Sequence, residues 1–231
     1  MRTKVWIVCG LVLLSAELAH AGSISGTIRA HGKDGSEIAE SSGKYASRKF
    51  KFAERIDYSE LRDFVVYIDQ PLGTNAIPDK PLQVVTTRKI SQKGAVFSPH
   101  VLPVVVGTTV EWPNYDEIFH NVFSISEAKQ FDLGLYKQPE IKRVLFDKPG
   151  RVDVFCSIHK SMNCIVLVLE NPFFAVADDQ GRYRITNLPA GTYRLKSWHE
   201  RLPSLNKEVT VPEQGEVRLD LTLGIENLPK Y

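Results

Sequence analysis

The sequence predicts an all-β protein of the sandwich or barrel type. Apolar residues recur in short runs rich in Val, Ile, Thr and aromatic residues, and turn-forming Gly, Pro, Asn or Asp bounds most of these runs. No repeat of fixed period is visible, which excludes solenoids and propellers. The runs expected to be strands are SISGTIRA, DFVVYID, HVLPVVVG, TTVEW, HNVFSI, RVDVFC, CIVLVLE, GRYRIT, GTYRLKSW and EVRLDLTL.

The first residues predict a secretory signal peptide over residues 1–21. Arg2 and Lys4 precede an apolar run that ends before the small-residue signal Ala19-His20-Ala21, so cleavage is expected before Gly22. The apolar run is too short to span a hydrocarbon core of about 30 Å. The mature chain is therefore expected to be periplasmic or secreted, with no transmembrane segment after cleavage.

The net charge and the cysteine content exclude some classes of protein. The chain has 231 residues and a net charge of +2, and cleavage removes two positive charges and one negative, which leaves +1. No basic excess indicates nucleic acid as a partner. The mature chain keeps only Cys156 and Cys164. It is not a disulfide scaffold, although a single disulfide between these two cysteines is an alternative interpretation.

The segment VFCSIHKSM predicts a metal site. Cys156, His159 and Met162 have the spacing CxxHxxM directly after a predicted strand. A thiolate, two imidazoles and a distant thioether form the trigonal site, with a weak axial ligand, that copper selects. His120 is expected to supply the second imidazole, because it follows a strand and a turn and begins the run HNVFSI.

Two segments give a specific resemblance. VGTTVEWPNYDEIFHNVF resembles the first-ligand segment of the cupredoxins, the small blue copper proteins, and FCSIHKSM resembles their ligand loop, with spacing most similar to amicyanin. The resemblance covers residues 82–170 and implies a Greek-key cupredoxin sandwich with one type 1 copper. It implies that Cys156, His120 and His159 form the plane of ligands around the copper and that Met162 is the axial ligand. It also implies that His159 lies at the surface edge as an electron port, and it favours Asn121 over Asn114 for holding the first-ligand loop.

The C-terminal part predicts a second sandwich. FAVADDQGRYRITNLPAGTYRLKSWHE resembles the carboxypeptidase regulatory-like (transthyretin-like) β-sandwich, whose two opening strands here precede residue 82. We therefore expect residues 82–170 to be inserted between the first part of this sandwich, 22–70, and the second, 171–231. A simple tandem arrangement is the alternative. Residues 32–62 look like a charged insertion with a short helical turn near its end, and 71–80 look like a connector.

The mature chain has further histidines and a second cysteine outside the predicted metal site. His100 and His199 are possible secondary ligands, although ordinary structural roles are the commoner ones for isolated histidines. Cys164 is expected to be a buried strand residue, and a modified or binuclear site is the alternative. A nucleophilic-cysteine enzyme would need an oxyanion hole, which nothing in the sequence marks, so the chain is not expected to be an enzyme.

The function expected from the sequence is that of a periplasmic type 1 copper protein that carries single electrons between redox partners. A cytochrome or a dehydrogenase is the expected type of partner. Proteins with a similar arrangement are often labelled methylamine utilization proteins. The alternatives are a copper-binding protein for storage or delivery, and a carbohydrate- or protein-binding β-sandwich.

Overall fold

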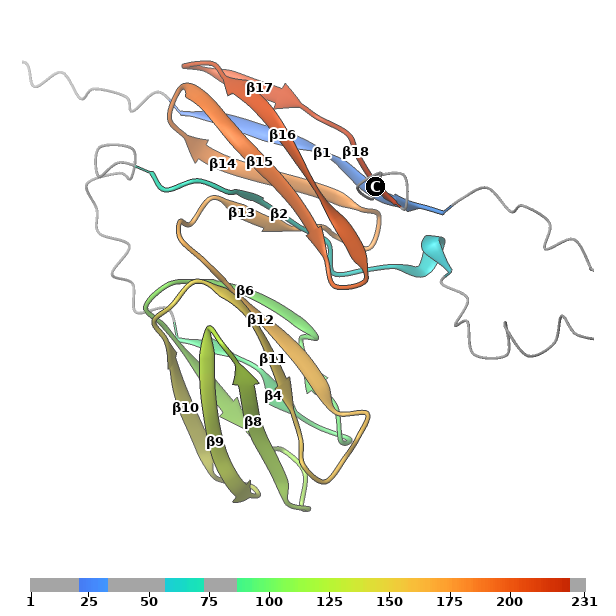
Figure 1. Cartoon of the computed structure of the whole chain (residues 1–231), viewed down its shortest axis with the longest axis vertical. Coiled ribbons are helices and arrows are strands. Elements are labelled where there is room, and N and C mark those ends of the chain that lie inside the picture. The colour runs from blue at the N-terminus through green and yellow to red at the C-terminus, as the bar shows by residue number, and fades with distance from the viewer. Residues whose placement is uncertain (1–20, 33–56, 73–86, 225–231) are drawn as a thin grey trace, which may run out of the picture.

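The computed structural model describes residues 21–32, 57–72 and 87–224, and this part of the chain is all-β (Figure 1). Its single helical element is the short 3-10 helix Tyr58–Glu60, where a helical turn is expected. The predicted fold class is confirmed. The predicted signal peptide, most of the charged insertion and most of the connector lie outside the described residues.

The strands form two β-sandwiches that stack along the long axis of the molecule (Figure 1). The terminal sandwich contains β1 (Gly22–His31), β2 (Val65–Ile68), β13 (Phe174–Val176), β14 (Arg182–Leu188), β15 (Gly191–His199), β16 (Leu202–Val211), β17 (Gly215–Arg218) and β18 (Leu221–Gly224). The central sandwich contains β3 (Arg88–Lys89), β4 (Ser91–Gln92), β5 (Phe97–Ser98), β6 (Val101–Val105), β7 (Thr108–Pro113), β8 (His120–Ser126), β9 (Lys129–Tyr136), β10 (Ile141–Phe146), β11 (Gly150–Phe155) and β12 (Asn163–Leu169).

The terminal sandwich is assembled from both ends of the described chain. In one sheet β1 pairs with β14 on one side and with β17 and then β18 on the other; the second sheet has the order β13-β2-β15-β16. Alternating residues of β15 point to opposite faces of its sheet: Tyr193 and Leu195 are buried between the two sheets, whereas Arg194 is exposed to solvent. Gly181 ends the turn before β14 with φ +75°, and a Cβ there would clash with the Ile28 carbonyl.

The central sandwich encloses a second core. Its larger sheet has the order β6-β12-β11-β8-β9 and faces a smaller sheet of order β10-β7-β3, with the β4-β5 hairpin beside them. Alternate residues of each strand point inward, as in a half-buried sheet. The most deeply buried members of this core are Ile90, Val110, Trp112, Val122, Phe146, Val152, Val154 and Val166.

Strand β12 is buried on both faces and joins the two sandwiches. Its inward residues, such as Val166, belong to the central core, while Ile165 and Leu167 pack with Val65 and Trp198 of the terminal sandwich in a third apolar cluster. This double burial explains why the strand reads as a continuous apolar run rather than an alternating one. The two sandwiches therefore contact each other through packed side chains.

Within residues 21–32, 57–72 and 87–224, three strands longer than five residues were not among the expected runs. They are β9, β10 and β16. In β9 and β16 charged and polar residues interrupt the apolar pattern, as in the exposed Lys207 and Glu208 of β16. Both are edge strands, and their pairing with the neighbouring β8 and β15 places them.

Within the described ranges, no helix has the length and apolar character needed to cross a membrane.

Candidate metal centre

His120 is the first residue of β8 and is fully buried. Its backbone pairs with Tyr136 of β9, and Val122, two residues further along β8, is in the central core. Because side chains alternate along a strand, the pairing that buries Val122 also turns the imidazole of His120 inward. The sheet thus fixes the position of this histidine.

Cys156 and His159 come from the loop that joins β11 to β12. The loop is closed by two backbone hydrogen bonds: Cys156 N–H donates to the Met162 carbonyl at 3.1 Å, and Met162 N–H donates to the His159 carbonyl at 3.0 Å. Cys156 is buried, whereas His159 is only partly buried and its neighbour Ile158 is half-exposed. His159 is therefore the more exposed of the two histidines in this group.

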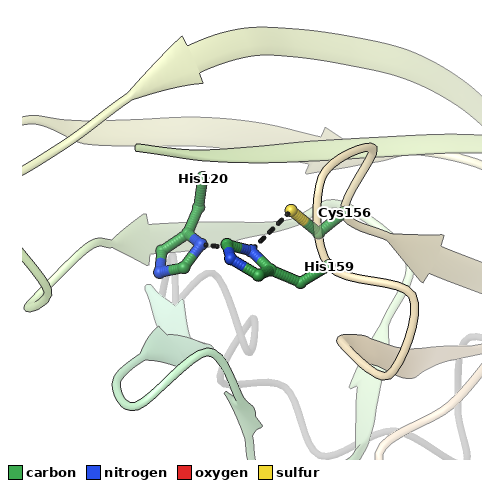
Figure 2. Close-up of side chains that lie close together, drawn as sticks. All are labelled: His120, Cys156 and His159. Carbon is green, nitrogen blue, oxygen red and sulfur yellow. Dashed lines mark hydrogen bonds between the residues drawn. The ribbon is translucent and has the colours of Figure 1, made fainter. Parts of the chain in front are cut away.

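The three side chains converge on one point (Figure 2). Nδ1 of His120 lies 3.2 Å from Nδ1 of His159, and Nδ1 of His159 lies 3.7 Å from Sγ of Cys156. All three potential ligand atoms lie within 4.8 Å of one another. Donor atoms that share one ion at about 2.0–2.3 Å are separated by about 3–4 Å, so this spacing suits a common metal ion.

Asp116 orients the buried histidine from the opposite side of its ring. Its carboxylate accepts a hydrogen bond from Nε2 of His120 at 2.8 Å. Nε2 therefore carries the proton in the neutral ring. The lone pair of Nδ1 is left free to bind a metal and faces the potential ligand atoms of His159 and Cys156. Sequence reasoning did not select Asp116.

The Asp116 carboxylate is itself held by a turn. It accepts hydrogen bonds from the backbone N–H groups of Gly94 at 2.8 Å and Ala95 at 3.0 Å. Burial alone would raise the pKa of Asp116, but these two hydrogen bonds and the bond from His120 lower it to about 2. Asp116 is thus an anion under ordinary conditions, which favours its role as acceptor for His120.

Asn121 and Asn114 make different contacts around the site. The backbone N–H of Asn121 points at Cys156 Sγ at 3.5 Å, and its side chain donates to Asp132. Asn114 donates from its side chain to the Ile118 carbonyl at 3.1 Å and accepts from Asp116 N–H at 2.8 Å. Asn114, and not the favoured Asn121, therefore holds the first-ligand loop, because only the side chain of Asn114 bonds within it.

Met162 and Cys164 occupy different positions beside the ligand loop. Met162 is fully buried in the central core, in the same cluster as Cys156. Cys164 of β12 pairs with Val154 of β11 and lies outside the His-Cys-His group. Both described cysteines are free thiols, so the alternative of a disulfide between them is wrong. Cys164 is the buried strand residue that was expected.

His100 and His199 do not join the three converging residues. Nε2 of His100 bonds to Glu200 at 3.1 Å, and its Nδ1 lies 3.3 Å from the Asn163 carbonyl. His199 is buried in the terminal sandwich, stacks on Phe64 at 4.8 Å and accepts a hydrogen bond from Arg201 N–H. Each of these histidines has protein partners of its own, away from the group that could share one ion.

No family model and no curated protein matches the chain. Among solved structures it is similar to a purple cupredoxin from Nitrosopumilus maritimus, at 28% identity over 36% of this chain and 99% of that one, with a TM-score of 0.33. It is also similar to a copper-containing nitrite reductase from Thermus scotoductus SA-01, at 31% identity over 44% of this chain and 26% of that one, with a TM-score of 0.35. A reduced Cu(I) form of an amicyanin mutant matches at 21% identity over 45% of this chain and 98% of that one, with a TM-score of 0.34.

These similarities each cover less than half of this chain, so the chemistry of the site is judged from its own residues. The donor set is one thiol sulfur and two imidazole nitrogens, with a buried methionine at the end of the same loop. Soft sulfur together with imidazole is the combination that selects copper, and a trigonal His2Cys set with a weak thioether is typical of copper sites that transfer electrons. The residues present fit a copper ion.

Proposed function

We propose that the protein is a type 1 copper electron carrier with His120, Cys156 and His159 as equatorial ligands and Met162 as the axial ligand. The observation that carries this proposal is the convergence of one sulfur and one ring nitrogen from each histidine within 4.8 Å. A copper ion bound there would supply one-electron chemistry between Cu(I) and Cu(II). The protein's own residues would supply the fixed geometry and the access for electrons.

The ligands are held by structures that do not depend on the ion. His120 is fixed by β8 and by its bond to Asp116, and the ligand loop is closed by its own backbone hydrogen bonds. The Asn121 N–H that points at Cys156 Sγ would withdraw negative charge from the sulfur and so adjust its donor strength. A site that changes little between two oxidation states favours electron transfer.

Access for electrons is favoured at one edge of the site. His159 is partly exposed, and Ile158, Ile118 and Phe119 beside the two histidines in sequence are each about half-exposed (50%, 51% and 50%). A contiguous exposed apolar patch marks a contact surface for other proteins, and these three side chains would form one around the two histidines. We infer that a redox partner, of the cytochrome or dehydrogenase class, docks here, and that the protein works in the periplasm or outside the cell.

The domain arrangement that we propose keeps the copper domain, residues 82–170, inserted between residues 22–70 and 171–231 of the second sandwich. The pairing of β1 with β14, and of β2 with β13 and β15, supports this arrangement over a tandem one. In a tandem arrangement residues after 170 would not need β1 or β2 to complete their sheets. The second sandwich resembles the carboxypeptidase regulatory-like fold, and binding of a carbohydrate or protein by it remains a second candidate function.

Electrochemistry on the copper-loaded mature chain separates the electron carrier from a storage or delivery protein. The carrier predicts a reversible one-electron couple and retention of copper after reduction and reoxidation. Loss of the ion on reduction, with no reversible couple, would instead support storage or delivery. Cys164→Ala is the matched control, because it alters a buried thiol near the ligand loop but outside the converging group.

A further inference from the structure

The terminal sandwich reaches the ligand loop through two side chains. His100 lies in the turn between β5 and β6 of the central sandwich, and Glu200 lies in the turn between β15 and β16 of the terminal sandwich. Nε2 of His100 is 3.1 Å from Oε1 of Glu200. On the other side of the ring, Nδ1 is 3.3 Å from the carbonyl oxygen of Asn163. His100 therefore bridges Glu200 and the backbone of Asn163.

Asn163 connects this bridge to the proposed ligands. It directly follows Met162, and its side chain donates to the carbonyl of Ser161 inside the loop. It also pairs with Phe155, the residue before Cys156. The backbone of His100 helps from the same side, because its carbonyl accepts from Ile165 N–H at 2.8 Å. Both ends of the ligand loop are thus adjacent to the point where His100 bonds.

The chemistry of the bridge makes it stronger than a neutral contact. Nε2 of His100 can donate to the Glu200 carboxylate, which only accepts hydrogen bonds. A hydrogen bond to a carboxylate is charge-assisted, and such bonds are roughly twice as strong as neutral ones. The two side chains are only 34% and 28% exposed, which limits screening by water.

The bridge is reinforced by the packed interface beside it. Val101, which follows His100, packs in the apolar cluster that contains Trp198, two residues before Glu200. Arg151 of β11 also lies over the ring of Trp198, at 5.8 Å from its centroid. The turn that carries Glu200 is consequently held against the central sandwich. A movement of that turn would displace His100 and so change its contact with Asn163.

We propose that Glu200 and His100 form an interdomain link through which the terminal sandwich positions the ligand loop. Both are positioning residues, since neither belongs to the converging donor group. The terminal sandwich would thus help to hold the metal site, in addition to binding any partner of its own. This role rests on the proposed function only for the purpose of the positioning, because the hydrogen bonds of the link lie outside the converging donor group.

Amide hydrogen exchange on the metal-free mature chain tests the link. The amides of Cys156 and Met162, which close the ligand loop, are followed in wild type, Glu200→Ala and His100→Ala. Both variants should speed exchange at these two amides by about 5-fold or more, the factor expected when one modest interaction is lost. Glu200→Gln keeps an acceptor oxygen without the charge and should give a smaller increase. Glu213→Ala changes an exposed acid of the terminal sandwich and is the matched control.

Two results would overturn the link: loop exchange equal to that of Glu213→Ala, or an equal acceleration at every protected amide, which would indicate general destabilisation. Copper loading provides the second readout. If wild type binds copper, Glu200→Ala should also shift its visible and EPR spectra, and unchanged spectra would count against positioning. If wild type binds no copper yet the loop amides respond to Glu200→Ala, the link stands and the proposed function fails.

Discussion

Asp116 lies 2.8 Å from Nε2 of His120, four residues along the chain, and thereby leaves Nδ1 of the same ring facing His159 and Cys156. The carboxylate is anchored by the Gly94–Ala95 turn, so the fold decides which nitrogen of His120 is available to a metal. Carboxylates that hold a ligating histidine in this way affect metal affinity without touching the metal.

Asp116→Ala should therefore weaken copper binding by about 10–100-fold, the usual cost of losing such a partner. Asp116→Asn keeps one acceptor oxygen and should fall between wild type and the alanine variant. Competition titration with a copper chelator measures both. The control is Asp147→Asn, which breaks an exposed ion pair with Lys129 and should leave the affinity unchanged. Equal affinities for Asp116→Ala and wild type would show that Asp116 does not orient His120.

Met162→Leu should change the reduction potential of the loaded protein with little loss of stability. The side chain is buried at 1% exposure, and exchange of Met for Leu nearly conserves volume, so the expected cost in stability is under about 1.5 kcal/mol. Removal of a thioether donor disfavours the more highly charged Cu(II), which should raise the potential. Voltammetry together with urea unfolding checks both parts. An unchanged potential would mean that Met162 only fills the core.

Cys164 should be almost inert to alkylation in the folded protein. Burial, and then the negative charge of Asp153, raise the pKa of the Cys164 thiol well above its ordinary value, so little thiolate forms. Timed alkylation with iodoacetamide at pH 8, followed by peptide mass spectrometry, should label Cys164 only after urea is added. Rapid labelling in the native protein would contradict the buried position on β12.

The terminal sandwich should lose stability as the pH falls below about 6.5, in part through His199. Burial lowers the pKa of His199 from its ordinary value of 6.5, and Glu200 offsets this only partly. The unfolded chain therefore binds a proton that the folded chain resists, so stability is retained above pH 6.5 and lost as the pH falls toward the lowered value. Urea unfolding at pH 7.5 and 5.5 should show a larger loss for wild type than for His199→Gln. The same pH dependence in both proteins would exclude this contribution.

Much of the fold could be predicted from the sequence because burial leaves a local pattern. Runs such as those of β1, β8 and β15 alternate or are rich in branched residues, and flanking turn residues end them. The strands that were missed, β9, β10 and β16, carry charged residues on their open sides and depend on neighbours for their position. Pairing across many residues is not visible in a local pattern.

Some residues of the candidate site could be predicted from the sequence and others could not. Cys156, His159 and Met162 are close in sequence, and His120 begins a recognisable strand, so all four could be selected. Asp116 could not, because its significance depends on the Gly94–Ala95 turn, which only the folded chain brings to it. His100 was selected as a possible secondary ligand, but its bond to Glu200, a hundred residues away, gives it a different position.

The most direct test of the copper proposal is the visible and EPR spectrum of residues 22–231 after Cu(II) loading, recorded for wild type, Cys156→Ser and Cys164→Ala. The proposed site predicts an intense thiolate-to-copper band in wild type and Cys164→Ala that is absent from Cys156→Ser. A wild-type protein that remains colourless, or a band that persists in Cys156→Ser, would contradict a copper site built on Cys156.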